Sequence, residues 1–474
     1  MLRSAFHAAH ATLLYSIAKV REAGNRGALL ITVRTSSMKD AEFLQQPPQI
    51  AELAKLDGAG LAQRYTRILE RIAAFDPILR VFEGGAPDAA QVLAECARVA
   101  ECWPHPGRRP PLFGVPVGVK AIIRVAGRQI RCGSLLPADL FAGEEAVLVR
   151  QLREAGAIIL GHTISTEFAY AEPGPTCNPH HCGHTPGGSS SGSAAGVAAG
   201  FFSIGVGTQT VGSIIRPASY CGVTGFKPSY QRLPMDGFIS FSRSMDHPGF
   251  FGVGPHEIAS VMAALDPQWR RVSLPRTLRL ALPTGRYLDC ALPQSASWLR
   301  IRTEAVAARL EKQGCFMELV EIPCLDDIDG LRKRHELLIA AEAAQVHQQW
   351  FARFAPLYRP RTAALIKRGG KATKEDVEDA RASGLELRRR LHGLMEEHKV
   401  DFWLSPSSVG EADTTLYGTG SPIMNLPWTH AGLPSLSLPL SRGGVQGLPL
   451  GAQLVGGFGK DEEVLAAGMA MWMT

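Results

Sequence analysis

A chain of 474 residues, 45% of them hydrophobic, is long enough to bury a large core and has the composition of a globular protein. Its formal net charge of +6 is concentrated in residues 1–37, where five basic residues and one acid contribute +4 and leave about +2 for the remainder. No cluster of Lys and Arg interleaved with aromatic residues occurs elsewhere, so a nucleic-acid partner is disfavoured.

The cysteines, residues 1–37 and the apolar runs indicate where in the cell the protein is expected. Nine cysteines, odd in number and scattered, do not resemble a secreted disulfide framework and favour a reducing cytoplasm. Residues 1–37 are poor in acids and carry Arg and Ser, which fits either an organelle transit peptide or a segment upstream of a real start near Met38. The apolar run over residues 194–207 is about fourteen long, short of the roughly 18 needed to cross a bilayer, so no membrane span is expected.

Helix and strand patterns alternate along the first part of the chain. Residues 50–75 have helical spacing, and residues 115–119 predict a short apolar strand. Residues 144–155 predict a helix whose acidic start suits the helix dipole and whose end is capped by Gly156. Residues 157–160 follow it as a buried strand.

The same alternation returns in the second half. Thr373 begins a capping box that opens a helix running toward His398. The other predicted elements are a strand at 278–282, an amphipathic helix at 297–313, and strands at 316–322 and 401–404. This rhythm indicates an α/β fold.

Two glycine-serine turns are the strongest indication of chemistry. Residues 187–193 read GGSSSGS and residues 210–217 read TVGSIIRP. Serine hydroxyls flanked by glycines suit nucleophilic catalysis, with main-chain N–H groups stabilising an oxyanion. A flexible linker has a similar composition. However, residues 194–207 are small and apolar, which indicates that these serines lie against a core.

Other interpretations of these segments are weaker. Residues 188–192 match G-x-S-x-G with Ser190 as nucleophile, but the strand that an α/β-hydrolase elbow requires does not precede them. No Gly-Lys-Ser/Thr follows the glycines, as a P-loop requires. Residues 177–184 offer Cys and His ligands without paired metal-ligand spacing, so no metal is expected. Adjacent Asp246 and His247 are expected to be structural, not part of a Ser-His-Asp triad.

Taken together, the motifs resemble the amidase signature family. From Ser189 to Ser213 is 213 − 189 = 24 positions, which is the family's interval, and residues 112–120 are similar to its lysine segment. Further matches lie at residues 160–169, 244–246, 425–429 and 447–456. The resemblance spans roughly residues 50 to 460. It implies a single large α/β/α domain with a central mixed β-sheet over residues 38–474, in which residues 256–407 are the variable, pocket-forming part.

The resemblance also implies the roles of particular residues. Ser213 would be the nucleophile, Ser189 a bridging serine held by a cis peptide bond, and Lys120 the base. The oxyanion hole would be formed by the backbone N–H groups of Thr210, Val211, Gly212 and Ser213. Lys120 stands among apolar neighbours, a setting that lowers the pKa of a lysine. The alternative is a lysine that leaves the strand end for solvent.

The implied reaction is hydrolysis of a small-molecule amide through an acyl-enzyme, without a cofactor, with a homodimer left open. Ala121, Gln209 and Val211 depart from the usual family residues, and Arg216 follows Ser213 by three positions instead of two. None of these departures removes a catalytic side chain. We expect Arg216 to brace the fold against Asp246 or Glu167, the alternative being a contact with a substrate carboxylate.

Two other functions remain open. The family includes a subunit of the tRNA-dependent amidotransferase that works with a partner. The departures at Gln209, Val211 and Arg216 favour a stand-alone amidase. A non-catalytic binding protein on the same fold would be plausible if the lysine or either serine were missing, but all are present.

Overall fold

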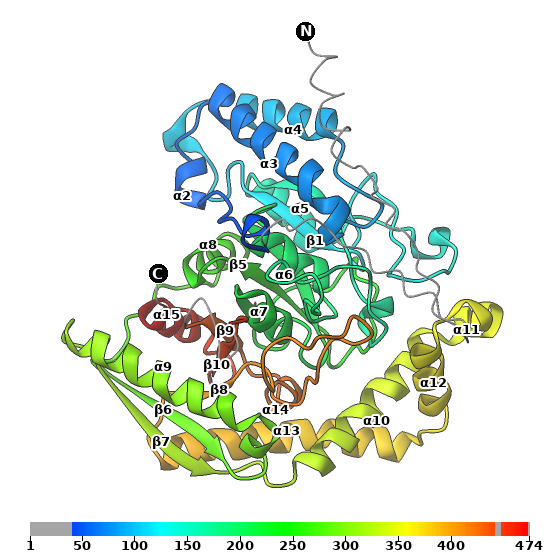
Figure 1. The fold of residues 1–474 in the computed structure, drawn as a ribbon. Helices are drawn as coiled ribbons and strands as arrows, with labels where there is room; N and C mark the ends of the chain where they lie inside the picture. The colour runs from blue at the N-terminus through cyan, green and yellow to red at the C-terminus, as the bar shows by residue number, and fades with distance from the viewer. Residues whose placement is uncertain (1–39, 441–446, 473–474) are drawn as a thin grey trace, which may run out of the picture. The chain divides into compact units, whose positions relative to one another are not determined.

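The computed structural model describes residues 40–440 and 447–472; the extension predicted for residues 1–37 lies outside them. The strands are β1 (Pro116–Lys120), β2 (Ile158–Thr163), β3 (Ile204–Gln209), β4 (Thr224–Lys227), β5 (His247–Gly252), β6 (Thr277–Thr284), β7 (Phe316–Pro323), β8 (Phe402–Pro406), β9 (Ser435–Pro439) and β10 (Gly451–Val455). Within the described residues they form one ten-stranded sheet in the order β2-β1-β3-β5-β4-β9-β10-β8-β6-β7 (Figure 1). The predicted α/β fold with a central mixed sheet is confirmed.

The helices lie before, between and after these strands. They are α2 (Ile50–Leu53), α3 (Gly58–Leu79), α4 (Ala89–Cys102), α5 (Val147–Glu154), α6 (Ser191–Ala198), α7 (Ile215–Cys221), α8 (Pro255–Leu265), α9 (Pro293–Glu311), α10 (Ile328–Val346), α11 (Gln348–Phe354), α12 (Pro360–Gly369), α13 (Lys374–Glu397), α14 (Leu426–His430) and α15 (Asp461–Met471). The capping box predicted at Thr373 is confirmed at the start of α13. In the ranges that the structure describes, no helix is long and apolar enough to cross a membrane.

The sheet is parallel toward its ends and antiparallel in its centre. β1 pairs in parallel with β2 and β3, and β6 pairs in parallel with β7 and β8. The intervening pairs, from β3–β5 through β10–β8, are antiparallel. Parallel neighbours need crossover connections, and the helices supply them. The connection from β1 to β2 contains α5, and that from β2 to β3 contains α6.

Small residues let α6 approach the sheet closely. A Cβ added at Gly118 of β1 or at Gly196 of α6 would lie 2.5 Å or 2.1 Å from the ring of Phe202. At Gly205 of β3 it would lie 2.6 Å from the carbonyl oxygen of Ser193. This packing keeps the segment before α6 next to the carboxyl end of β1, and α7 lies beside α6 (Figure 1).

Two predicted boundaries are wrong. The helical pattern over residues 50–75 is two helices, because the side chain of Asp57 accepts a hydrogen bond from Gly60 N at 2.7 Å and begins α3. The helix predicted from residue 144 begins at Val147, with no acid in its first turn. Glu145 instead accepts hydrogen bonds from Ala126 N at 3.0 Å and Arg153 Nε at 3.2 Å.

Candidate active site

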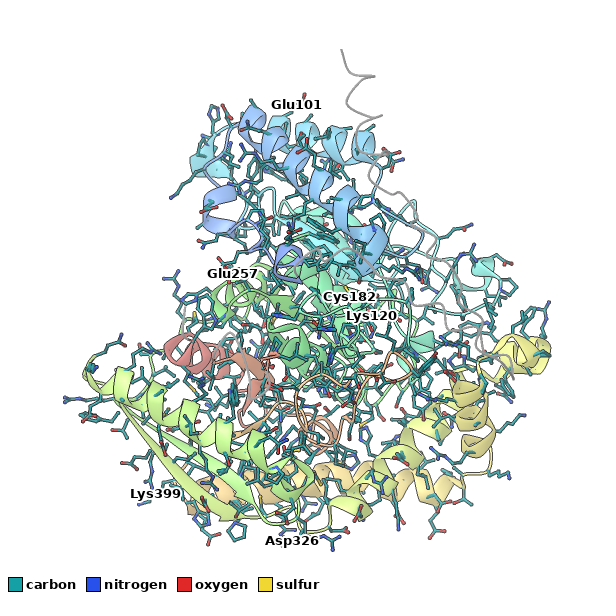
Figure 2. The ribbon with its side chains drawn as sticks, in the orientation of Figure 1. Glu101, Lys120, Cys182, Glu257, Asp326 and Lys399 are labelled. Carbon is teal, nitrogen blue, oxygen red and sulfur yellow. The ribbon has the colours of Figure 1, made fainter. Side chains whose placement is uncertain are left out.

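Lys120 ends β1 and is fully buried, so the alternative of a solvent-exposed lysine is wrong (Figure 2). Its Nζ donates to Ser189 Oγ at 2.7 Å and to Thr208 Oγ1 at 2.8 Å. Burial lowers the pKa of Lys120 well below its usual value, and the negative charge of Asp246 partly opposes that shift. A lowered pKa increases the fraction of neutral amine, the form of lysine that accepts a proton.

The first serine turn is held from several sides. The peptide bond between Gly188 and Ser189 is cis. The carbonyl oxygen of Ser189 accepts a hydrogen bond from Thr166 N at 3.1 Å. Ser190 is buried and its hydroxyl donates to Thr208 O at 3.2 Å, with no strand immediately before it, so the hydrolase elbow is absent at this position. Ser190 therefore fixes Thr208, the second residue that contacts the Lys120 amine.

The second serine turn lies directly against the first. Arg216 Nη2 donates to the carbonyl oxygen of Gly188 at 2.7 Å. A Cβ added at Gly187, whose φ is +79°, would lie 2.8 Å from Pro217 Cα. The backbone therefore requires glycine here for both conformation and space. These contacts join the segment that carries Ser189 to the helix that follows Ser213.

In the turn over residues 210–213, the carbonyl groups of the first three residues accept hydrogen bonds, and the N–H groups of the turn do not donate any within the described residues. Thr210 O accepts from His335 Nε2 at 3.0 Å, Val211 O accepts from Thr429 Oγ1 at 2.6 Å, and Gly212 O accepts from Arg216 N at 3.0 Å. Among the described residues, no acceptor pairs with the backbone N–H groups of this turn. The turn therefore presents unpaired donors, and Ser213 itself is 7% exposed.

Gln209 shows what its departure from the usual family residue does. Its Oε1 accepts from Ile214 N at 2.8 Å and Ile215 N at 3.0 Å, which caps the start of α7. Its Nε2 donates to Thr429 Oγ1 at 2.9 Å. The uncharged amide of Gln209 thus both accepts from the start of α7 and donates to the Thr429 hydroxyl.

Arg216 does not contact the partners that the sequence predicts for it. It is buried, and its Nη2 bonds Gly188 O and Thr419 Oγ1, with neither Asp246 nor Glu167 as a partner among the described residues. Both carboxylates are already occupied by other donors. Arg216 Nε and Nη1 are buried without a hydrogen-bond partner in the described chain, and burial lowers the pKa of Arg216 to about 10.

The other candidates from the sequence have structural partners. Asp246 accepts hydrogen bonds from Thr210 Oγ1 at 2.6 Å and Ser240 Oγ at 2.8 Å, which ties it to the second serine turn. His247 Nδ1 lies 2.6 Å from the carbonyl oxygen of Met245. In the loop over residues 177–184, the ring nitrogens of two histidines contact backbone carbonyls. The described residues contain no group of three or more side chains able to hold a metal.

A cavity of about 300 Å³ opens beside the second serine turn. It is lined by Ala169, Tyr170, Ala171, Thr210, Val211, Gly212, Ser213, Arg216, Phe241, Arg332, His335, Glu336, Ile339, Thr419, Gly420, Ser421, Pro422, Ile423 and Leu426. Tyr170 and Phe241 stack with ring centroids 5.3 Å apart. The cavity is thus lined by an aromatic pair, by Arg216 and by the second serine turn.

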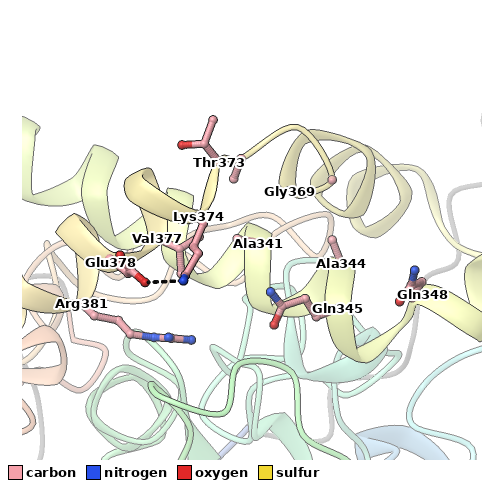
Figure 3. A pocket seen from close by; sticks show the side chains of 12 residues that line it. Ala341, Ala344, Gln345, Gln348, Gly369, Thr373, Lys374, Val377, Glu378 and Arg381 are labelled. Atoms are coloured by element: carbon pink, nitrogen blue, oxygen red, sulfur yellow. Dashed lines mark ion pairs between the residues drawn. The ribbon is translucent and has the colours of Figure 1, made fainter.

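A second cavity, of about 560 Å³, lies between α10, α12 and α13 (Figure 3). Lys374 and Glu378 form an ion pair of 3.6 Å at its edge. Neither serine turn nor Lys120 contributes to its lining. The larger cavity is therefore separate from the candidate active site.

Sequence reasoning missed three residues around the site: Thr208, His335 and Thr429. Thr429 lies in a segment that matches the family, so its position was visible but not its role. Thr208 is one residue upstream of Gln209, just before the second turn. His335 lies in α10, within a stretch without motif matches, and no local pattern marks it.

A comparison with known protein families identifies the family of this chain. A protein-family model described as Amidase matches residues 66–465. The chain belongs to the amidase signature family. Amide-bond hydrolysis is therefore supported as its general chemistry.

Relatives within the family differ in what they do. The glutamyl-tRNA(Gln) amidotransferase subunit of Synechococcus sp. (strain WH7803) is 28% identical over 442 residues, covering 82% of this chain and 88% of the relative. The subunit of the same name from Thiobacillus denitrificans is 30% identical over 456 residues, covering 85% and 91%. The solved peptide amidase from Stenotrophomonas maltophilia superposes with a TM-score of 0.72 at 25% identity, covering 89% of this chain and 94% of that one.

Proposed function

We propose that this chain hydrolyses the carbon–nitrogen bond of a small-molecule amide through an acyl-enzyme on Ser213, releasing ammonia or an amine and a carboxylic acid. The observation that carries the proposal is the fully buried amine of Lys120, 2.7 Å from the Ser189 hydroxyl. Desolvation disfavours the charged amine, which makes Lys120 able to take a proton from the serine.

In the proposed reaction, Ser213 Oγ attacks the carbonyl carbon of the amide, and its proton passes through Ser189 to neutral Lys120. The carbon–nitrogen bond then breaks and the proton goes to the leaving nitrogen. Water attacks the resulting ester, with its proton following the same route, and the acid leaves as Ser213 is restored. The chain needs no cofactor for these steps.

The open N–H donors of Val211, Gly212 and Ser213 support an oxyanion hole. These residues line the cavity, and their N–H groups have no acceptor within the described residues. Donors that are already oriented stabilise the negative oxygen of a tetrahedral intermediate without rearranging during the reaction, and each is worth about 100- to 1,000-fold in kcat. Thr210 N–H belongs to the same predicted set.

We propose that Arg216 has two tasks, one in the fold and one in substrate binding. Nη2 holds the carbonyl oxygen of Gly188. Nε and Nη1 have no partner among the described residues, and Arg216 lines the cavity, so a carboxylate or second carbonyl of the substrate would accept a hydrogen bond from one of them. Amides that carry such a group should therefore be better substrates than plain aliphatic amides.

A panel of purified amides tests the proposal through release of ammonia or amine. The panel pairs aliphatic, aryl and ureide amides with carboxylated versions of the same compounds. Lys120→Met should be inactive, whereas Lys227→Met, which replaces another fully buried lysine away from the serines, should retain activity. Hydrolysis that survives in Lys120→Met would contradict the proposed base.

A second candidate is an amidotransferase subunit that works with a partner. The names of the relatives from Synechococcus sp. and Thiobacillus denitrificans favour it. Such a subunit would release ammonia from glutamine efficiently only with its partner. Activity of the purified chain alone on the amide panel would favour the stand-alone amidase, whereas stable copurification with another subunit would favour the amidotransferase. Four expectations from the sequence stay predictions: the division at residue 38, the variable part at residues 256–407, the cytoplasmic location and a homodimer.

A further inference from the structure

A chain of buried polar groups approaches the second serine turn from α10 and α14. His335 Nε2 lies 3.0 Å from Thr210 O, and His335 Nδ1 lies 3.0 Å from His430 Nδ1. His430 Nε2 lies 2.8 Å from Ser383 Oγ. Both rings are buried. The reaction proposed for Ser213 uses neither histidine.

The partners decide where the protons lie. A carbonyl oxygen only accepts, so His335 Nε2 carries the proton that faces Thr210 O. With neutral rings, His335 Nδ1 then accepts and His430 Nδ1 donates to it, which leaves His430 Nε2 without a proton. Ser383 Oγ lies 2.8 Å from both His430 Nε2 and Ala380 O, so this assignment directs its one hydroxyl proton to His430 instead of Ala380. Burial supports neutral rings, because it lowers the pKa of His335 to about 4 and that of His430 to about 3. His430 thus fixes the tautomer of His335.

The contact with Thr210 O controls a neighbouring group. In a trans peptide unit the C=O of Thr210 and the N–H of Val211 lie in one plane and point in opposite directions. A donor that holds the carbonyl therefore sets the direction of the Val211 N–H. A hydrogen bond on the carbonyl also polarises the unit and strengthens the N–H as a donor.

The next peptide unit is held in the same way from the same place. Thr429 Oγ1 donates to Val211 O at 2.6 Å, which sets the direction of the Gly212 N–H. Thr429 precedes His430 in α14. The hydrogen bond from His430 to His335 therefore closes a ring that joins both anchored carbonyls through α14 and α10.

We propose that His335, held in one tautomer by His430, is a positioning residue that orients the peptide unit between Thr210 and Val211 as an oxyanion donor. The inference rests on the proposed function of Ser213. It adds a requirement beyond the serines and the lysine. The N–H donors stabilise an oxyanion only while the carbonyl groups of the same peptide units are held by hydrogen bonds.

A fluorophosphonate probe tests the inference without knowledge of the substrate. Ser213 Oγ forms a bond to phosphorus, the phosphorus–fluorine bond breaks, fluoride leaves, and the hydroxyl proton passes to Ser189 and Lys120. The phosphoryl oxygen needs the oxyanion donors. The second-order rate of labelling is measured by intact mass, and Ser213→Ala gives the background.

His335→Leu should slow labelling on the order of 10- to 100-fold, because one donor loses its orientation. His335→Gln keeps an N–H donor for Thr210 O and should stay within about 3-fold of the unsubstituted chain. His430→Leu is the decisive variant, since His335 lines the cavity but His430 does not. It should slow labelling severalfold although it removes no group that can touch the probe.

His347→Leu is the matched control. His347 follows the end of α10, is fully buried, and contacts Tyr358 instead of residues 210–213. It should lower the melting temperature without changing the labelling rate. Folded His335→Leu or His430→Leu that labels as fast as the unsubstituted chain would overturn the inference while leaving Ser213 as nucleophile. If His335→Leu does not fold, the labelling rate of His430→Leu alone tests the inference, and an unchanged rate overturns it. No labelling of Ser213 in the unsubstituted chain would overturn the proposed function and the inference with it.

Discussion

A methyl group added at Gly212 should lower the catalytic rate while leaving the protein folded. A Cβ added there would lie 2.3 Å from Asn425 Oδ1 and 3.0 Å from Pro422 Cβ. Since real Cβ atoms essentially never come closer than 3.0 Å to another group, Gly212→Ala forces a shift of at least 3.0 − 2.3 = 0.7 Å. Either the turn or Asn425 has to move.

The structure indicates that the turn moves. Asn425 Nδ2 donates to Ser407 O and Gln453 Oε1, each at 2.9 Å, which holds the amide group in place. A displacement of about 1 Å at a reacting group costs about 100-fold in rate. We therefore expect Gly212→Ala to lower kcat on the order of 10- to 100-fold, at a cost in the free energy of unfolding of about 1 to 3 kcal/mol from overpacking.

The assay compares the rate of fluorophosphonate labelling, or of hydrolysis of an amide identified with the panel, with the melting temperature. Gly393→Ala in α13 is the control, because a Cβ there meets nothing within 4 Å; it should leave the rate unchanged. Combining Gly212→Ala with Asn425→Ala removes the closest clash and should restore part of the rate. If Gly212→Ala alone keeps the full rate, the turn does not supply the oxyanion donors.

Four further predictions concern the serine and two buried lysines. Ser213→Ala should abolish hydrolysis without unfolding the protein, and near-normal turnover would exclude Ser213 as nucleophile. Lys120→Arg keeps a positive charge but cannot give up its proton, so kcat should fall about 100- to 10,000-fold. Because burial lowers the pKa of Lys120, activity of the unsubstituted chain should rise with pH through an apparent pKa below that of an ordinary lysine, and a profile that rises only above it would contradict the base. Burial lowers the pKa of Lys227 to about 7. Between pH 7 and the ordinary pKa of a lysine, the unfolded chain therefore binds more protons than the folded chain. The free energy of unfolding should increase with pH over this range, by up to about 1.4 kcal/mol per pH unit. Lys227→Met should flatten that slope in denaturant titrations, and an unchanged slope would show that Lys227 is not its source.

Elements with local signals could be predicted from the sequence. The apolar run before Lys120 is a buried strand, and Thr373 with Asp376 caps α13 through side-chain and backbone contacts three residues apart. The break after α2 is harder to predict, because the cap at Asp57 interrupts a continuous apolar period. A helix cap changes the pattern at only a few residues, so the apolar periodicity on both sides makes the break hard to recognise.

Long-range contacts could not be predicted. Arg216 and Gly188 are 28 positions apart, and nothing near either residue indicates which carbonyl or carboxylate the guanidinium reaches. His335 and Thr210 are separated by 125 positions. Such pairs depend on how α10 packs beside the turn, which is decided by the whole core and not by a motif.

Gln209 illustrates how one departure from the family pattern can depend on residues elsewhere. An Asp at this position could accept the N–H groups that begin α7, but it would have no donor for Thr429. The amide of Gln209 does both, since Oε1 faces Ile214 N and Nε2 faces Thr429 Oγ1. The hydroxyl proton of Thr429 has two acceptors in reach, Val211 O at 2.6 Å and Asn425 O at 3.1 Å, and the shorter contact favours Val211 O. The residue before the turn thus helps to orient the N–H of Gly212, and its identity follows from an anchor about 220 positions away.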